Sequence, residues 1–293
     1  MKIATNRLRG ISETLLFTLY MRYKESVRPG GKITDPRYAQ LIERIDFDFS
    51  IYDDVPDDFQ IGIICRSIIF DSVVRAFIAR HPDATVVSLG PGLDFTYERV
   101  TNGRIHWFNV DLPEVIRLRR LLYPPVGRMR QIAASVLDFT WMKQIPQKAP
   151  VFILAEGLLV YLPQHNVQEL LIRLAETFPG SELILDAYSN FYIRHAKQTA
   201  THPFLRRMAA MWQWGVDDWQ TIEAWHPLIR LIQEYFPYES FGERLPAGFK
   251  AFLEDDTLPE GLLDELLKMT RIGHFALGGT VEDVEMEGVE SKR

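Results

Sequence analysis

The sequence predicts an α/β protein with a Rossmann-like, mainly parallel seven-stranded sheet and helices on both faces. From residue 84 onward, short apolar segments alternate with helical segments, which is the pattern of consecutive strand–helix units. One segment, Val151–Ala155, is apolar throughout, as expected of a central parallel strand buried on both faces. A Gly-x-Gly turn follows the first apolar segment, at the point where such proteins bring bare backbone close to a ligand.

Length and composition limit the possible protein classes. A chain of 293 residues fits one enlarged domain better than two, and its 47% hydrophobic residues suffice for a large core. The net charge of −6 argues against a protein that binds nucleic-acid backbones, which usually carries a basic excess. The single cysteine, Cys65, excludes an intrachain disulfide and a multi-cysteine zinc site, and predicts a cytoplasmic protein.

Residues 1–83 are predicted to form a helical cap that leads into the core. Ser12 is expected to cap a helix to about residue 26, and Asp35-Pro36 to start a second, because proline suits the first helical position. A long helix is expected from Phe59 to Arg80. The apolar segment 15–21 has charges on both sides and no small-residue cleavage site, which favours an amphipathic helix over a signal peptide.

Residues 84–187 are predicted to form the ligand-binding core, in which strands and helices alternate. The expected strands are Thr85–Leu89, His106–Val110, Met129–Ser135, Val151–Ala155 and Leu183–Ala187. Helices are expected near residues 95–102, 112–122, 139–144 and 164–178.

Residues 188–228 interrupt this alternation and predict a helical insertion. It contains four of the six tryptophans, which suit either a lid over a substrate pocket or ordinary packing between helices: Trp212, Trp214, Trp219 and Trp225. Residues 229–278 are expected to complete the core with two strands, Tyr238–Glu243 and Ile272–Leu277. The acidic tail, 279–293, is expected to be disordered.

The turn after the first strand, Gly90-Pro91-Gly92 with Asp94, indicates the class of ligand. Glycine adopts backbone conformations that other residues avoid, and it has no side chain to hold a ligand away. A dinucleotide-binding fingerprint requires a third small residue three positions after the second glycine, where this chain has Phe95. The turn therefore favours a nucleoside without a pyrophosphate, such as S-adenosylmethionine.

Acidic residues follow the next three strands as well. Asp111 comes about 20 residues after the glycines, where an acid accepts hydrogen bonds from ribose hydroxyls. Asp138-Phe139 follows the third strand, where an acid can bind the adenine amine and an aromatic ring can cover the base. Glu156 follows the fourth strand. Since the carboxyl ends of parallel strands meet at one edge of a sheet, these residues outline an adenosine-shaped site.

Each of these residues also has a purely structural interpretation. Asp111-Leu112-Pro113-Glu114 is also the pattern of a capping box, and Asp138 suits a helix N-cap. Glu156 could be solvated at its strand end, and any tight turn uses glycine. The order and spacing of all four features together favour the cofactor site.

Four segments follow one another along the chain: Leu89-Gly90-Pro91-Gly92-Leu93-Asp94, Trp107-Phe108-Asn109-Val110-Asp111-Leu112-Pro113, Ser135-Val136-Leu137-Asp138 and Ala155-Glu156-Gly157-Leu158-Leu159-Val160-Tyr161-Leu162. With these segments in this order, the chain resembles the leucine carboxyl methyltransferase family, and within it the bacterial branch of polyketide-type O-methyltransferases. The resemblance covers most of the chain. The Asp-Leu-Pro and Glu-Gly-x-x-x-Tyr-Leu motifs are fairly specific to the family, whereas the glycine turn is not.

The resemblance implies a class I methyltransferase that uses S-adenosyl-L-methionine and releases S-adenosyl-L-homocysteine. It implies that Arg66 pairs with the cofactor carboxylate, that the glycine turn contacts the methionine part and that Asp111 holds the ribose. The full set of implied cofactor-binding residues is Arg66, Gly90, Gly92, Asp94, Asp111, Leu112, Asp138, Phe139 and Glu156. The family usually has threonine at the position of Phe95, so a hydroxyl contact is missing there.

The residues themselves support a role for Arg66. It lies in the apolar segment Ile61–Phe70, where a guanidinium needs a carboxylate partner. That partner is either the cofactor or an internal salt bridge, for which Asp71 is a candidate.

Methyl transfer from a sulfonium is an in-line displacement, so the protein mainly supplies alignment and desolvation. A carboxylate nucleophile needs no base, whereas a phenol or alcohol benefits from one. The candidates at the expected pocket mouth are Tyr161, Tyr188, Tyr192, His195 and His202, and Tyr161, Tyr188 and His195 are the predicted catalytic residues. His195 and His202 are seven residues apart and could share one helix face. No metal is expected, since no zinc-site spacing is found.

The predicted function is methyl transfer to a carboxyl or hydroxyl oxygen of a small molecule, such as a polyketide or another secondary metabolite. Two alternatives are a protein C-terminal carboxyl methyltransferase and a non-catalytic protein that binds S-adenosylmethionine. Phe95 disfavours a Rossmann dehydrogenase. The expected partner is a small-molecule methyl acceptor, with neither nucleic acid nor membrane, while the acceptor's identity and the oligomeric state are left open.

Overall fold

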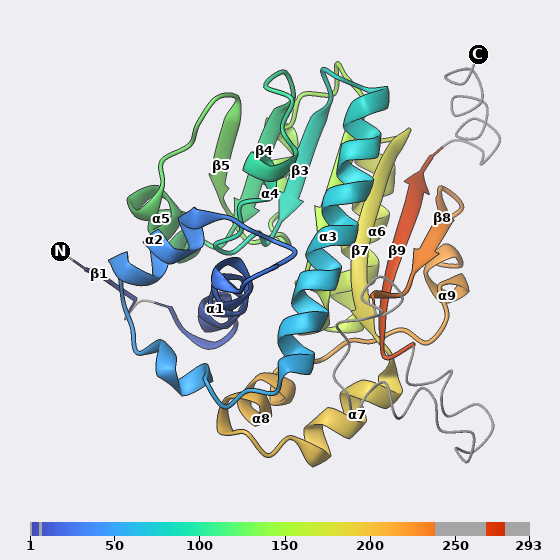
Figure 1. Cartoon of the computed structure of the whole chain (residues 1–293). Helices are drawn as coiled ribbons and strands as arrows, with labels where there is room; N and C mark the ends of the chain where they lie inside the picture. Colours follow the sequence, from blue (N-terminus) through green and yellow to red (C-terminus); the bar gives the residue numbers. More distant parts are fainter. Residues whose placement is uncertain (1, 6–7, 238–267, 279–293) are drawn as a thin grey trace.

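A seven-stranded sheet forms the centre of the molecule, in a computed structural model that describes residues 2–5, 8–237 and 268–278 (Figure 1). The strand order is β5-β4-β3-β6-β7-β9-β8. All neighbouring pairs from β5 to β7 are parallel, and β9 pairs antiparallel with both β7 and β8. The predicted α/β architecture with a mainly parallel seven-stranded sheet is confirmed.

The five parallel strands lie where the sequence predicts them, with ends that differ by at most two residues. They are β3 (Thr85–Leu89), β4 (His106–Asp111), β5 (Met129–Ala133), β6 (Val151–Ala155) and β7 (Ser181–Tyr188). The chain order reverses at β3, which lies between β4 and β6. Such a reversal opens a crevice at the carboxyl ends of the strands, where α/β proteins bind ligands.

The last part of the sheet differs from the prediction. The antiparallel strand β9 (Thr270–Leu277) was expected, but β8 (Ile229–Tyr235) was not. β8 forms the edge of the sheet, and most of its residues are half-buried. Its pairing with β9 has a register shift between Leu231 and Gln233. For both reasons, its sequence shows no regular apolar pattern. The predicted strand Tyr238–Glu243 lies outside the described residues.

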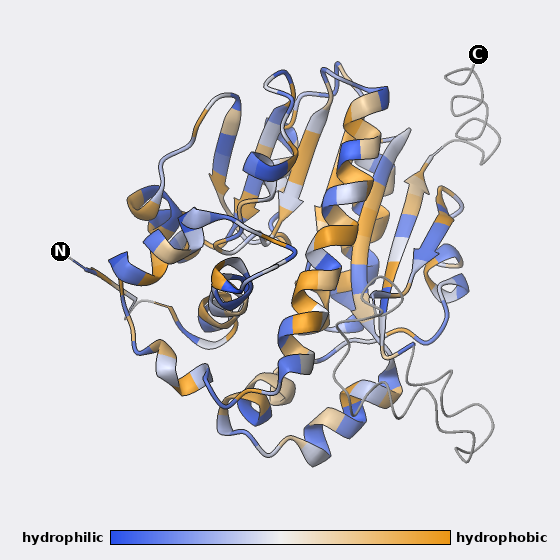
Figure 2. Cartoon of the chain, in the orientation of Figure 1, coloured by the Kyte–Doolittle hydropathy of each residue, from blue (hydrophilic) through white to orange (hydrophobic). Residues whose placement is uncertain are grey.

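Helices cover both faces of the sheet. On one face α3 (Asp57–Arg80) and α4 (Thr96–Val100) pack on alternate strand residues such as Val86, and on the other α6 (Gln164–Thr177) packs on neighbours such as Val87. α5 (Pro113–Leu122) follows β4, and the predicted helix over 139–144 is a 3-10 helix. Figure 2 shows apolar residues along the central strands and the middle of α3.

The N-terminal cap contains α1 (Thr14–Val27) and α2 (Pro36–Arg44), with short elements around them. Asp35 caps α2 as predicted, because its side chain accepts a hydrogen bond from the N–H of Arg37. The prediction for Ser12 was wrong. Ser12 lies inside a 3-10 turn, Gly10–Glu13, and its hydroxyl hydrogen-bonds the backbone of Arg9 instead of capping α1.

Further short elements complete the cap. The two-residue strands β1 (Ile3–Ala4) and β2 (Ile45–Asp46) pair in parallel, and a 3-10 turn spans Phe49–Tyr52. Apolar residues of α1, α2, α5 and α8 form one buried cluster. This cluster holds the cap against the carboxyl-end side of the sheet.

The predicted helical insertion contains α7 (Asn190–Thr199), α8 (Pro203–Ala210) and the short α9 (Gln220–Glu223). Figure 1 shows α1, α7 and α8 together beyond the carboxyl ends of the parallel strands. In the described part of the chain, no helix is long and apolar enough to cross a membrane.

Candidate active site

A cavity of about 900 Å³ lies at the carboxyl ends of β3, β4 and β6. The loops after these strands line one end, together with residues of α1 and α3. Residues of α7, α8 and the segment after α8 line the other. We call the part of the cavity lined by the strand-end loops the glycine-turn end, and the part lined by α7, α8 and the segment after α8 the aromatic end.

The glycine turn lines the cavity with both of its glycines. Gly90 has φ +61° and Gly92 has φ +55°, in the left-handed region that other residues rarely adopt. A Cβ on Gly90 would also lie 2.9 Å from Cδ1 of Leu158. The backbone conformation thus favours glycine at Gly90, and a Cβ there would displace the end of the Leu158 side chain.

Asp111 links the end of β4 to the glycine turn. Its Oδ2 accepts a hydrogen bond from the N–H of Gly92 at 2.9 Å, and its Oδ1 accepts one from the N–H of Leu112 at 2.8 Å. The capping-box alternative is not formed, since Leu112 is the N-cap of α5 and no side chain caps it. Burial raises the pKa of Asp111 to about 6. Asp111 and Leu112 both line the cavity.

Arg66 and Glu156 form a buried ion pair at the same end. The Nε of Arg66 lies 3.1 Å from Oε1 of Glu156, and its Nη1 lies 3.0 Å from Oδ2 of Asp186. The internal salt bridge considered from the sequence therefore exists, but not with Asp71, which pairs with Arg99. Arg66 also lines the cavity, where a cofactor carboxylate could reach it.

Glu156 is not solvated at its strand end. Besides Arg66, it accepts hydrogen bonds from Arg22 at 2.7 Å and from the hydroxyl of Ser67 at 3.0 Å. Arg22 comes from α1, 134 residues earlier in the chain. The N-terminal cap is thus joined directly to the end of β6.

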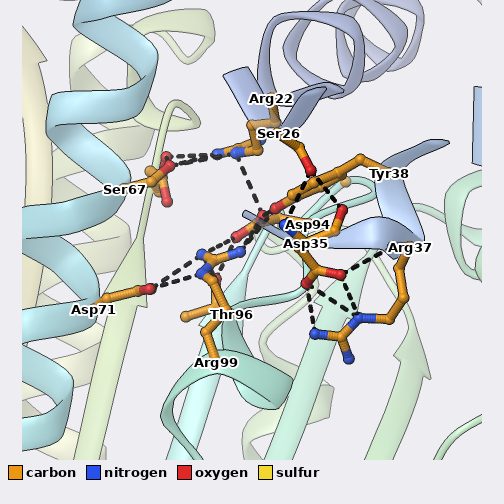
Figure 3. A network of polar contacts seen from close by, with 12 residues as sticks. Arg22, Ser26, Asp35, Arg37, Tyr38, Ser67, Asp71, Asp94, Thr96 and Arg99 are labelled. Carbon is orange, nitrogen blue, oxygen red and sulfur yellow. Dashed lines mark hydrogen bonds and ion pairs between the residues drawn. The ribbon is translucent and has the colours of Figure 1, made fainter. Parts of the chain in front are cut away.

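Asp94 is the centre of a second buried network, shown in Figure 3. It accepts hydrogen bonds from Tyr38 at 2.6 Å and from Arg99 at 2.9 Å, and it lies 3.3 Å from Nε of Arg22. Burial opposes its ionisation, but the charges of Arg22 and Arg99 outweigh it and hold the pKa of Asp94 well below its usual range. Thr96 also donates to Asp94.

Sequence reasoning missed several residues of these networks. Arg22, Tyr38, Arg99 and Asp186 come from four different elements and carry no local motif. Buried charges in apolar helices are the one signal that could have identified Arg22 as well as Arg66, because such groups need partners.

Asp138 and Phe139 are placed differently from the glycine turn. Asp138 is exposed and caps the 3-10 helix Phe139–Gln144, accepting from the N–H of Thr140 at 3.2 Å. Both are described residues, and neither is among those that line the cavity. The loop after β5 instead contributes Ala134, Ser135 and Val136 to the cavity lining. An adenine-binding role for Asp138 and Phe139 remains a prediction.

Aromatic side chains build the other end of the cavity. The ring centroids of Tyr188 and Trp212 lie 4.7 Å apart, and Tyr192 lies 5.2 Å from Tyr188 and 5.8 Å from Trp212. Tyr161 is buried beside them, and burial raises the pKa of its hydroxyl. All four line the cavity.

The other three tryptophans of the insertion pack elsewhere. Trp214 and Trp225 lie against each other with centroids 6.4 Å apart, and Trp219 packs on Phe275 of β9. They belong to the cluster that includes the α6 face of the sheet. Trp212 therefore lines the cavity and the other three pack in the core, while a lid function of the insertion stays a prediction.

The two histidines also line the cavity but do not share a helix face, so that expectation was wrong. His195 lies in α7, is exposed and stacks on Phe191. His202 is the N-cap of α8, and its Nδ1 accepts a hydrogen bond from the N–H of Phe204 at 3.2 Å. A turn between the two helices separates them. Within the described ranges, no cluster of three His, Cys, Asp or Glu side chains could hold a metal ion.

The glycine-turn end has the donors and charges that S-adenosylmethionine requires. Asp94, Asp111 and Glu156 line it with the guanidiniums of Arg22 and Arg66, and Asp54 is a further carboxylate of the cavity lining. The cofactor carries a sulfonium, an ammonium and a carboxylate, a net charge of one positive unit. The excess of carboxylates over guanidiniums in the lining complements that charge.

Sequence comparison reveals the chain's relatives. The sequence model of the leucine carboxyl methyltransferase family matches residues 33–175. TcmP of Streptomyces glaucescens, a tetracenomycin polyketide synthesis O-methyltransferase, is 33% identical over 237 residues, which cover 80% of this chain and 86% of that protein. The chain belongs to the leucine carboxyl methyltransferase family. It is a methyltransferase that uses S-adenosylmethionine.

A second relative is also a methyltransferase by name, and two solved structures share the fold. dpfgK of Gibberella zeae, an S-adenosyl-L-methionine-dependent methyltransferase, is 29% identical over 249 residues, 78% of this chain and 83% of that protein. A DUF574 family protein of Streptomyces avermitilis shares the fold, with a TM-score of 0.58 and 13% sequence identity. The match covers 92% of this chain and 99% of the other chain. A Thermobifida fusca protein, provisionally assigned as a methyltransferase, gives 0.55 at 16% identity, covering 92% and 95%.

Proposed function

We propose that this family member transfers the methyl group of S-adenosylmethionine to a carboxyl or hydroxyl oxygen of a small aromatic molecule. The observation that carries the proposal is one continuous cavity with two chemically different ends. The polar glycine-turn end suits the cofactor, and the ring cluster of Tyr188, Tyr192 and Trp212 suits a flat acceptor. The name of TcmP, a polyketide O-methyltransferase, supports the same class of acceptor.

Each residue would have a distinct part in binding. Asp111 would accept hydrogen bonds from the ribose hydroxyls, and Arg66 would pair with the cofactor carboxylate. Gly90 and Gly92 would let the methionine part approach the backbone, with Asp94 holding the turn in place through Arg22 and Arg99. When bound, the cofactor supplies an electrophilic methyl group. Because the cofactor has a good leaving group, the protein mainly has to supply alignment and desolvation.

At the aromatic end, the candidate catalytic tyrosines and the candidate catalytic histidine would have different roles. Since burial raises the pKa of Tyr161, its hydroxyl stays protonated near neutral pH and would orient the acceptor as a donor instead of acting as a base. Tyr188 would form part of the wall that stacks on the acceptor. His195 is exposed at the cavity and would accept the proton when the acceptor is a phenol.

A protein C-terminal carboxyl group is the second candidate acceptor, because the family takes its name from that substrate. The two candidates are separated by assaying transfer from labelled S-adenosylmethionine to a panel of hydroxylated and carboxylated polycyclic aromatics, and to peptides that end in leucine. The proposal expects turnover of members of the aromatic panel and none of the peptides. Turnover of the peptides alone would contradict it.

A further inference from the structure

The turn between α7 and α8 forms part of the wall at the aromatic end. Thr199, Ala200, Thr201 and His202 line the cavity in succession, followed by Leu205 and Met208 on α8. His202 is half-buried there and is the last side chain of this turn before the helix begins. Its ring caps the helix end, and the residue is also part of the cavity lining.

The hydrogen bond at the helix end defines the chemical state of this ring. Nδ1 of His202 accepts from the N–H of Phe204, so Nδ1 carries no proton. A neutral imidazole has one N–H, which must then be on Nε2. Within the described residues no group accepts a hydrogen bond from this Nε2. His202 is thus held as a donor with a free N–H, in a residue that lines the cavity.

Charged donors are absent from this end in the described residues. The cavity lining contains two guanidiniums, those of Arg22 and Arg66, and both lie within 3.3 Å of carboxylates at the glycine-turn end. From the described residues, an acceptor at the aromatic end can be bound by ring contacts and neutral donors. Such donors recognise oxygens that accept hydrogen bonds without requiring a full negative charge.

We infer that His202 is a specificity-determining residue whose Nε2–H donates a hydrogen bond to a carbonyl or similar oxygen on the ring system of the methyl acceptor. This inference rests on the proposed function, because it assigns the aromatic end to the acceptor. The acceptor class is then an oxygenated aromatic molecule, recognised through an oxygen in addition to its ring faces. The side chain of His202 thus caps α8 and also donates a hydrogen bond to this oxygen.

The test compares two probes of nearly equal size, 2-acetylnaphthalene and 2-ethylnaphthalene, which differ in a carbonyl oxygen. Their dissociation constants are measured by calorimetry with S-adenosylhomocysteine present, for the wild type and for His202→Asn. Asparagine is a preferred N-cap, so the variant keeps the cap of α8 and loses the Nε2–H. One neutral hydrogen bond corresponds to about a tenfold preference for the acetyl probe, which the variant is expected to lose.

His226→Asn is the matched control. Nδ1 of His226 likewise accepts from the N–H of Leu228 at 3.2 Å, but His226 does not line the cavity, so this variant should keep the preference. The inference is overturned if His202→Asn retains the wild-type preference, or if neither probe binds the wild type. Neither probe carries an oxygen to be methylated, so a failure of the proposed methyl transfer would appear separately, in the turnover assay.

Discussion

The carboxylate of Asp111 accepts a hydrogen bond from the main-chain N–H of Gly92 at 2.9 Å, so the end of β4 holds the turn that ends β3. One carboxylate oxygen is used for this contact and the other for the N–H of Leu112. Each oxygen can accept a further bond, so Asp111 can keep both contacts while it binds two hydroxyls of a ribose. The residue that shapes the turn is thus also the one proposed to bind the cofactor.

The affinity for S-adenosylhomocysteine is expected to fall as the pH falls below about 6. Burial raises the pKa of Asp111 to about 6 in the free protein, and hydroxyl donors bind the ionised form. Below that pH the carboxyl must lose a proton before it binds, so the dissociation constant should rise about tenfold per pH unit. Calorimetry between pH 5 and 8 measures this. A flat profile in the wild type would contradict the role of Asp111.

Replacing Gly90 by alanine should weaken cofactor binding more than it weakens the fold. The positive φ of +61° costs an alanine about 1–2 kcal/mol, and its Cβ would press on Leu158 beside the cavity. Gly103→Ala is the matched control, because Gly103 has φ +77° and a Cβ added there would meet no atom within 4 Å. Both variants should lose similar stability in urea denaturation. Only Gly90→Ala should lose affinity for S-adenosylhomocysteine.

Asp186→Asn should lower the affinity for S-adenosylhomocysteine by about tenfold without abolishing folding, because Arg66 loses a charged hydrogen-bond partner. Asp186 does not line the cavity, but it accepts hydrogen bonds from Nη1 of Arg66 at 3.0 Å and from the N–H of Gly157 at 2.6 Å. Loss of its charge should release Arg66 from its position. Glu182→Gln, on the same strand but away from the cavity, is the control and should leave this affinity unchanged.

Glu182 should make the folded state sensitive to acid. Burial raises its pKa, but the hydrogen bond with His274 and the charge of Arg80 outweigh this and hold the pKa of Glu182 below its usual value. Because its pKa is lower in the folded state, Glu182 stabilises the fold at pH values above its unfolded pKa of about 4.3. This stabilisation is lost as the pH falls through the pKa of Glu182 in the folded protein. Urea denaturation at pH 7 and pH 4 should show a larger loss for the wild type than for Glu182→Gln. Equal losses would contradict this account.

Trp212→Phe should raise the KM for the aromatic acceptor several-fold, because it reduces the ring surface that packs on Tyr188 and Tyr192. The KM for S-adenosylmethionine should stay the same, since Trp212 lies at the opposite end of the cavity from the glycine turn. Trp214→Phe, in the core, should change thermal stability and neither KM. A matching rise in both KM values for Trp212→Phe would indicate a general structural effect instead.

The sequence predicted the parallel core well because its strands and turns are locally encoded. Val151–Ala155 is apolar throughout and buried throughout, and the glycine turn has the required positive φ angles. β8 was missed because Arg230, Gln233 and Glu234 interrupt its apolar pattern at the sheet edge. An edge strand with a register shift has little local signal.

The site was predictable only in part for a related reason. Asp111 and Glu156 follow strands, so their convergence could be inferred from topology. Their partners could not, because contacts such as Arg22 with Glu156 join residues 134 positions apart. Likewise, the spacing of His195 and His202 could not reveal that a turn separates α7 from α8.

The most direct test of the account is the binding of S-adenosylhomocysteine to the wild type and to Asp111→Ala, measured by calorimetry with NAD as the control ligand. Asp48→Ala, an N-cap variant away from the cavity, controls for loss of an acid. Tight binding to the wild type and to Asp48→Ala is expected, with a large loss in Asp111→Ala and no binding of NAD. Undiminished binding by a folded Asp111→Ala variant would contradict the proposed cofactor site.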